Sequence, residues 1–240
     1  DSAFSYTFDF KLLKKIKKKT LFNTKFLTSD IKFLDKCEKY LKKVSKIKNI
    51  QLNTLFIHDG NNLISKEGFE LFNRILHLKK KKIIKKIGVS FHNFKNIKKI
   101  LNNFKIDVVQ IPFSAVDQRA LRIFKIIKNK NIEIQARSIF LQGSLLSKIK
   151  TNSKLSLIYD KMLLKKKVDR VNSLLSFVLN EKNIDKILIG VRQASELRMI
   201  LNFKKLKFYK NVYNNLKTKD ESIINPLNWK ELNYHEKKKL

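Results

Sequence analysis

Four polar side chains stand at or near the ends of short apolar runs, where a folded chain could use them for chemistry. Lys25 closes LFNTK, His58 closes TLFIH, Ser90 closes IGVS, and Gln110 lies within VVQIPFS. A buried lysine shifts its pKa readily and needs an anionic partner, and Asp1 and Tyr6 could supply a carboxylate and a phenol. Taken singly, a lysine or histidine at such a position is more often a surface or packed core residue, so only the whole set points to catalysis.

The elements that would carry these side chains are brief runs rich in β-branched and aromatic residues, which are typical of buried parallel strands. We expect strands at residues 21–26, 54–58, 84–90, 106–113, 132–138 and 187–191. Between them, apolar residues recur at helical spacing, with lysines on the opposite faces. These stripes fall within residues 31–47, 69–76, 94–104, 116–127, 171–178 and 197–201.

Strands that alternate with helices predict an α/β fold with a parallel sheet. An open doubly wound sheet and a closed (β/α)8 barrel both agree with this alternation. Doubly wound nucleotide-binding folds usually carry a glycine-rich first turn. This chain has only 5 Gly, with neither GxGxxG nor GxxxxGK[ST], so the Rossmann and P-loop alternatives are weakened. In a parallel barrel, side chains that do chemistry lie at the C-terminal ends of the strands.

The domain organisation is simple. No proline-rich or glycine-rich linker divides the chain, whose 2 prolines, Pro112 and Pro226, stand alone. We therefore expect a single domain over residues 1–240, with a Lys-rich C-terminal extension from about Lys204. Apolar residues make up 43% of the chain and include 18 Phe, which is enough for a core and argues against disorder.

Composition excludes several classes of protein. The sequence has no run of about 18 uncharged apolar residues, so we expect no membrane span. Its first residues show no basic region followed by an apolar stretch, so we expect no secretory signal. The single cysteine, Cys37, excludes an internal disulfide framework and a Cys-rich metal site, and it falls on an apolar helical stripe that predicts burial. No His or carboxylate cluster has the spacing of metal ligands, so we expect no metal. A reducing, cytoplasmic setting is the default expectation.

The formal net charge of +34 suggests nucleic-acid binding. However, only seven of the 54 basic residues are Arg, the side chain that nucleic-acid sites favour for bidentate and stacked contacts. The chain is also rich in Ile, Asn and Phe, which share AT-rich codons with Lys. We therefore expect solvated lysine-rich faces and no specific nucleic-acid partner.

Seven segments, in chain order, resemble motifs of the aldo-keto reductases. They are DSAFSY at 1–6, NTK at 23–25, LFIH at 55–58, IGVS at 87–90, VQIPFS at 109–114, ARSIFLQG at 136–143, and LIGVR at 188–192 followed by Glu196-Leu197. Each motif alone is weak. The ordered set covers nearly the whole chain, so the resemblance is specific.

The resemblance implies a (β/α)8 TIM barrel with a catalytic tetrad of Asp1, Tyr6, Lys25 and His58. Hydride addition to a carbonyl builds negative charge on oxygen, and an acid must then donate a proton. A tyrosine near its usual pKa of about 10 is a poor acid at neutral pH, and a neighbouring lysine cation lowers that pKa. The aspartate would keep the lysine charged and oriented. His58 would donate a hydrogen bond to the carbonyl oxygen, completing an oxyanion site.

The resemblance also implies a nicotinamide cofactor held without a glycine-rich motif. Family frequency favours NADP, with NAD as the alternative. The residues that match the family's cofactor segments are Ser90, Gln110, Arg137, Ser138, Gly190 and Arg192. The first two would contact the carboxamide, the planar guanidinium of Arg137 would stack on the nicotinamide ring, and Gly190 and Arg192 would lie beside the phosphates.

Compared with this family, the sequence begins at the end of the second barrel strand. We therefore expect a fragment in which strand 1, helix 1 and most of strand 2 are missing. The leading hypothesis is an NAD(P)H-dependent reductase that converts an aldehyde or ketone to an alcohol. The alternatives are a catalytically inactive barrel that binds a cofactor or a partner, and a basic nucleic-acid-binding protein. The expected partner is a small carbonyl compound, whose identity the sequence leaves open together with the oligomeric state.

Overall fold

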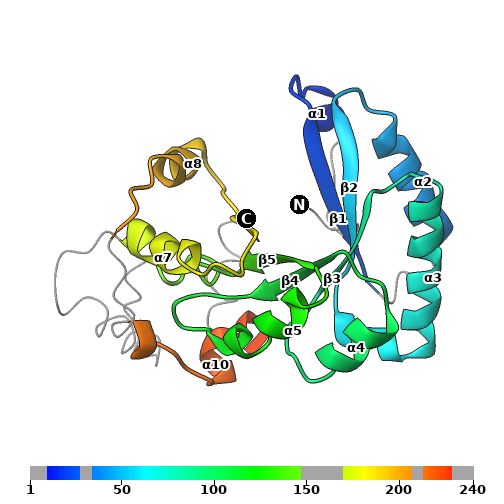
Figure 1. The fold of residues 1–240 in the computed structure, drawn as a ribbon. Coiled ribbons are helices and arrows are strands. Elements are labelled where there is room, and N and C mark those ends of the chain that lie inside the picture. Colours follow the sequence, from blue (N-terminus) through cyan, green and yellow to red (C-terminus); the bar gives the residue numbers. More distant parts are fainter. Residues whose placement is uncertain (1–9, 28–33, 147–169, 207–212, 229–240) are drawn as a thin grey trace. The chain divides into compact units, whose positions relative to one another are not determined.

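The computed structural model describes residues 10–27, 34–146, 170–206 and 213–228 (Figure 1). Its contacts divide the chain into two compact units. The first comprises Asp1–Ile111 and Lys125–Gln135, and the second Pro112–Phe124 and Ala136–Leu240. The strands form a six-stranded sheet whose order, β1-β2-β3-β4-β5-β6, follows the chain.

The first unit contains most of the strands and their covering helices. The strands are β1 (Thr20–Phe26), β2 (Ile50–Ile57), β3 (Lys86–Ser90), β4 (Val108–Pro112) and β5 (Glu133–Arg137), the last two ending in the second unit. The helices are α1 (Phe10–Lys14), α2 (Leu34–Ser45), the 3-10 helix η2 (Gly60–Ile64), α3 (Lys66–Lys80), α4 (Ile97–Asn103) and α5 (Phe124–Lys128), the last beginning in the second unit. Pairing is parallel from β1 to β2, from β2 to β3 and from β3 to β4, as the alternation of strands and helices predicted.

One face of this sheet is apolar. Because side chains alternate along a strand, and β1 to β4 run in register, one set of positions points to the same face. Besides Thr24, the register partner of Leu55, it consists of Phe26, Leu55, Ile57, Ile87, Val89 and Val109. All six are fully buried. Helices α2 and α3, which lie side by side next to β1 and β2 in Figure 1, contact β2 and β3 respectively. The fully buried Cys37 is on α2, which confirms the position that its apolar stripe predicted.

The opposite face of the same strands is largely polar. Its positions include Asn23 and Lys25 on β1, Thr54 and Phe56 on β2, Lys86 and Gly88 on β3, and Gln110 on β4. The side chain of Asn23 accepts hydrogen bonds from the backbone N–H of Thr54 (3.1 Å) and from the side chain of Asn53 (3.2 Å). These two bonds lie next to a register shift between Phe22 and Asn23, where the pairing of β1 with β2 moves by one residue.

The second unit is built around α7 and aromatic side chains. Its elements are η3 (Arg119–Arg122), α7 (Arg170–Leu179), β6 (Lys186–Ile187), α8 (Ala194–Leu201), α10 (Glu221–Ile224) and η4 (Pro226–Asn228). The ring of Phe177 stacks on Phe113 with centroids 5.1 Å apart and lies 5.0 Å from Tyr213. The Tyr213 hydroxyl is 2.8 Å from Ser173 Oγ. Residues expected to form a Lys-rich extension therefore contribute to this core.

An ion-pair group links α10 to η3. Arg119 pairs with Asp117 through Nε and with Glu221 through Nη1. Burial disfavours the charged guanidinium, but the hydrogen bonds and charges of Asp117 and Glu221 outweigh this effect and raise the pKa of Arg119. Residues 116–127, expected as one helical stripe, divide between η3 and α5 instead, and in the turn before η3 the Asp117 side chain accepts from the Arg119 backbone N–H.

Two general properties follow from the described part of the chain. None of its helices is long and apolar enough to cross a membrane. Within the same residues, no three His, Cys, Asp or Glu side chains gather as a group that could hold a metal ion.

Candidate active site

Lys25 and His58 come from the ends of neighbouring strands and share the polar face. Lys25 is the register partner of Phe56, and its Nζ lies 6.0 Å from the centroid of the Phe56 ring. His58 follows β2 two residues after Phe56, so strand alternation turns it to the same side. Its backbone N–H donates to the carbonyl of Phe26 (2.9 Å), which continues the β1–β2 ladder to this point.

Ser90 and Gln110 extend the same face to β3 and β4. They are register partners, and both are buried, with 3% and 0% exposure. Phe56 pairs with Gly88, and Ser90 follows Gly88 by two positions. Strand alternation therefore places His58, Ser90 and Gln110 on the same face of the sheet. The structure thus brings four of the predicted site residues to one face of the first unit.

Gly88 provides the space for the Phe56 ring. A Cβ atom at position 88 would lie 2.2 Å from Cδ1 of Phe56 and 2.3 Å from Cε1, both impossible contacts. The fully buried ring therefore rests against the glycine on one side while Lys25 lies over it. Contact with the Phe56 ring therefore explains why position 88 is glycine, independently of any motif that the segment IGVS matches.

His92 is a residue of this region that the sequence interpretation left without a role. Its ring centroid is 5.4 Å from that of His58, with the ring planes tilted by 45°. Both imidazoles are half-buried. His92 follows Ser90 by two positions, so extending the alternation of β3 beyond its end would have placed it on the polar face.

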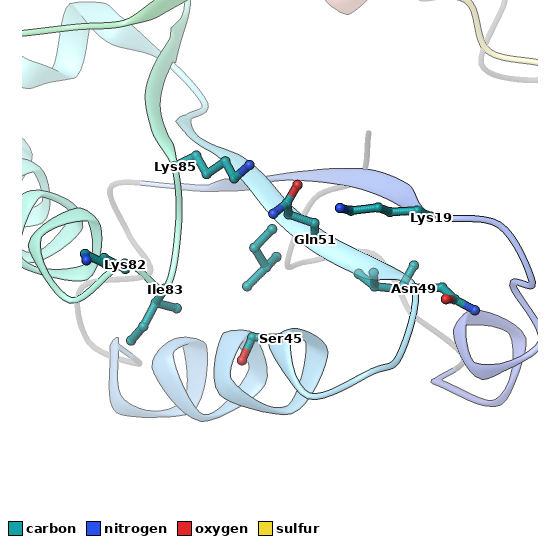
Figure 2. A pocket seen from close by; sticks show the side chains of 9 residues that line it. Lys19, Ser45, Asn49, Gln51, Lys82, Ile83 and Lys85 are labelled. Carbon is teal, nitrogen blue, oxygen red and sulfur yellow. The ribbon is translucent and has the colours of Figure 1, made fainter.

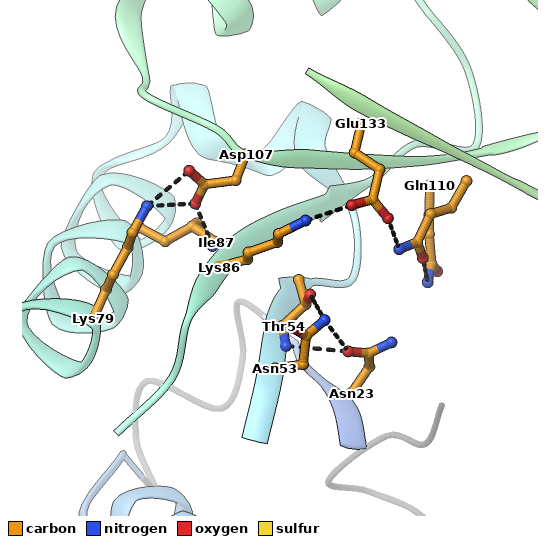
Figure 3. Close-up of polar contacts among 10 residues, drawn as sticks. Asn23, Asn53, Thr54, Lys79, Lys86, Ile87, Asp107, Gln110 and Glu133 are labelled. Carbon is orange, nitrogen blue, oxygen red and sulfur yellow. Dashed lines mark hydrogen bonds and ion pairs between the residues drawn. The ribbon is translucent and has the colours of Figure 1, made fainter. Parts of the chain in front are cut away.

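A chain of hydrogen bonds connects Gln110 to charged groups on the polar face (Figure 3). Gln110 Nε2 donates to Gln135 Oε1 (3.1 Å), and Gln135 Nε2 donates to Glu133 Oε1 (2.7 Å). The other carboxylate oxygen of Glu133 pairs with Lys86 Nζ. Separately, Asp107 pairs with Lys79 and accepts from the backbone N–H of Ile87 (2.7 Å).

The remaining predicted residues divide between the second unit and undescribed parts of the chain. Arg137 ends β5, is half-buried, and donates from Nη1 to Ser138 Oγ (3.1 Å). Ser138 has a positive φ of 61°, which is uncommon for a residue with a side chain. Gly190 and Arg192 follow β6 and are exposed, and the Arg192 backbone N–H donates to Glu196 (2.7 Å). Asp1 and Tyr6 lie outside the described residues.

A separate pocket of about 440 Å³ lies at the N-terminal ends of β1 to β3, away from Lys25 and His58. Its lining includes Lys19, Lys82 and Lys85 and no acidic residue. Figure 2 shows the amino groups of Lys19 and Lys85 directed toward Gln51 from two sides. All three lysines are exposed, so this end of the unit carries part of the chain's positive charge.

Comparison with protein families gives the same grouping as the ordered motifs. The model of the aldo/keto reductase family matches residues 11–221. The chain belongs to the aldo/keto reductase family. Its α/β fold is that of the family's (β/α)8 barrel neighbours, as expected from the sequence. No match was found among curated proteins.

Solved structures of reductases resemble the chain throughout most of its length. Aldo-keto reductase AKR11C1 from Bacillus halodurans, in its holo form, matches with a TM-score of 0.65 and 16% identity, covering 87% of this chain and 75% of its own. An aldose reductase from Giardia lamblia matches with a TM-score of 0.59 and 13% identity, covering 84% and 75%. The thermostable aldo-keto reductase Tm1743, in complex with the inhibitor epalrestat, matches with a TM-score of 0.60 and 16% identity, covering 81% and 69%. At these identities the likeness describes the fold.

Proposed function

We propose that this chain is an oxidoreductase that uses NAD(P)H to reduce an aldehyde or ketone to an alcohol. The observation that carries the proposal is the alignment of Lys25, His58, Ser90 and Gln110 on one polar face of a parallel sheet, near the C-terminal ends of its strands. Catalytic side chains of parallel barrels lie at that end. Membership of the family supports the same class of reaction.

The residues present fit a nicotinamide cofactor at its carboxamide end. Ser90 and Gln110 are buried neighbours that offer a hydroxyl and an amide, and a carboxamide both donates and accepts hydrogen bonds. In the second unit, Arg137 would lie against the ring, with Ser138 beside it, and Gly190 and Arg192 would hold the phosphates. When bound, the reduced nicotinamide supplies the hydride. NADP is the proposed form on family frequency, with NAD as the alternative.

The proton chemistry is assigned to four side chains of this sequence. Tyr6 is the proposed acid, and the ammonium of Lys25 lowers the pKa of the phenol by favouring the phenolate. Asp1 keeps Lys25 charged. His58 donates a hydrogen bond to the substrate oxygen, and the nearby ring of His92 restricts how far the His58 imidazole can turn. Together these groups stabilise negative charge on the oxygen as the alcohol forms.

Two measurements on the full chain test this function. The first is titration with NADPH and NADH, followed by quenching of protein fluorescence, for which we expect saturation with at least one cofactor. The second is the loss of NADPH absorbance with a series of small aldehydes and ketones. No saturable binding of either cofactor would contradict the proposal, and binding without turnover of any carbonyl would leave a non-catalytic cofactor-binding protein.

We also propose a partner, a cellular location and a domain organisation. A small carbonyl compound is the proposed partner. A reducing cytoplasm is the proposed location, because the single cysteine, Cys37, allows no internal disulfide. The whole of 1–240 is proposed to act as one domain.

A further inference from the structure

The hydrogen-bonded chain from Lys86 to Gln110 has a direction that is set at its charged end. Glu133 is 14% exposed at its side chain and pairs with Lys86, so it is an ionised carboxylate. Gln110 and Gln135 are buried, with 0% and 2% exposure. The oxygen and nitrogen ends of a glutamine amide have nearly the same shape, so its orientation is decided by its hydrogen-bond partners.

The direction follows from the chemistry of each group in turn. An ionised carboxylate only accepts hydrogen bonds. Gln135 must therefore present Nε2 to Glu133, at the observed 2.7 Å, and this turns its Oε1 toward Gln110. Gln110 must then present Nε2 to that oxygen, at the observed 3.1 Å. A charge two side chains away thus determines which end of the Gln110 amide faces Gln135 and which end faces away from it.

We infer that Glu133, acting through Gln135, is a positioning residue that makes Gln110 present its carbonyl oxygen to the N–H of the cofactor carboxamide. The inference rests on the proposed function, in which Gln110 contacts that carboxamide. It adds a residue that touches neither substrate nor cofactor, and it gives a reason for a half-buried glutamate in β5. The predicted consequence is selection for a cofactor with an N–H donor at this position.

Replacing the carboxylate by an amide reverses the direction. In Glu133→Gln, the Lys86 ammonium is still only a donor, so it takes the oxygen of the new amide. The new Nε2 then donates to Gln135, Gln135 turns over, and Gln110 presents nitrogen instead of oxygen toward the cofactor. Gln135→Met has a different effect, because it removes the bond through which Glu133 orients the Gln110 amide.

The test compares affinity for NADP⁺ with affinity for its 3-acetylpyridine analogue, in which a methyl group replaces the carboxamide nitrogen. For the wild type we expect NADP⁺ to bind about 2- to 10-fold more tightly, the range of one net hydrogen bond. The preference should fall to about one in Glu133→Gln, because an amide N–H can donate only to the carbonyl oxygen that both ligands share. It should also fall to about one in Gln135→Met. The control is Asp107→Asn, which removes a carboxylate that also pairs with a lysine but is not bonded to Gln110, and should keep the wild-type preference.

A second measurement reports the chain of bonds without any cofactor. In protein labelled with ¹⁵N-glutamine, the side-chain amide protons of Gln110 and Gln135 should exchange slowly with solvent, and Gln135→Met should remove the protection of Gln110. Wild-type preference retained in both Glu133→Gln and Gln135→Met would overturn the inference. If the amides are protected as expected but the wild type binds neither ligand, the proposed function is wrong and the role given to Gln110 falls with it. Fast exchange of both amides in a wild type that binds NADP⁺ would instead overturn the positioning role alone.

Discussion

The two faces of the sheet in the first unit have different roles, one in stability and the other in the proposed chemistry. On one face, Leu55, Ile87 and Val109 are fully buried and contribute through apolar area removed from water. On the other, Lys25, Ser90 and Gln110 alternate with apolar positions along β1, β3 and β4, and their polar groups must be satisfied by partners. Substitutions on the first face should therefore reduce stability, and those on the second should reduce chemistry.

The polar face also has a cost that the apolar face avoids. A buried polar group left without a hydrogen bond destabilises the fold by about 1–3 kcal/mol. Glu133, Gln135 and the Nε2 atom of Gln110 meet this demand through one another. Such a network fixes the orientation of each member, which an apolar surface does not do for a ligand.

The largest expected effect is on the polar face, at Lys25. General acid–base effects are typically about 10²–10⁴-fold, so Lys25→Met should reduce kcat with a model aldehyde by that order while cofactor binding largely survives. His58→Ala should reduce kcat less. The measurement is kcat together with Kd for NADPH, and the control is Lys99→Met, which changes an exposed lysine on α4. Wild-type turnover by Lys25→Met would exclude the proposed tetrad.

The apolar face provides the opposite test, at Leu55. This side chain is fully buried between positions 54 and 56, whose side chains lie on the polar face. Leu55→Ala should lower the free energy of unfolding by about 2–5 kcal/mol through lost transfer energy and a residual cavity. Urea unfolding measures the change. Activity per folded molecule should stay at the wild-type level, and a comparable loss of kcat would mean that the two faces are not separate in function.

The strands were largely predictable because buried parallel strands carry β-branched and aromatic residues. Their bounds were not, because polar residues interrupt the apolar pattern. β2 begins at Ile50 rather than at 54, because the polar residues Gln51 and Asn53 interrupt the apolar pattern at its start. Asn53 forms a hydrogen bond with Asn23 at the register shift. The predicted strand at 187–191 is reduced to Lys186–Ile187.

The candidate site was predictable only where the signal is local in sequence. Lys25, His58 and Ser90 end apolar runs, and the structure puts them on one face. The bond between Gln110 and Gln135 joins residues 25 positions apart, and the ion pair between Lys86 and Glu133 joins residues 47 apart. Such partners depend on the register of neighbouring strands, which no single segment encodes.

Gly88 is the position where the requirements of packing and chemistry meet. In Gly88→Ala the new methyl group would overlap the Phe56 ring, forcing that ring to shift beneath Lys25. Overpacking of this kind typically destabilises by about 1–3 kcal/mol, and kcat should fall as Lys25 moves with the ring. Gly190→Ala is the control for stability, because a Cβ there meets no atom within 4 Å. Equal thermal stability of the two variants would contradict the steric role of Gly88.

A smaller effect is expected at His92. Pairs of aromatic rings contribute about 0.5–1.5 kcal/mol beyond area burial, so His92→Ala should free the His58 ring and reduce kcat about 2- to 10-fold. His92→Phe keeps a ring of similar shape beside His58 and should restore most of the activity. The kcat values of both variants, measured against His58→Ala, test this. If the phenylalanine variant is as slow as the alanine variant, His92 acts through its nitrogen atoms and not through ring packing.

The smallest effect concerns the positive charge, which belongs to neither face of the sheet. We expect weak, salt-labile and sequence-blind binding of DNA, because lysines spread over helices neutralise phosphates without reading bases. Changing Lys19, Lys82 and Lys85 of the N-terminal pocket together to Gln should weaken this binding slightly. Changing Lys80, Lys98 and Lys99, which are equally exposed, should weaken it by the same amount and lower the salt dependence equally. A much larger loss with the pocket variant, measured by fluorescence anisotropy across salt concentrations, would show that the charge is concentrated at a true anion site and not diffuse.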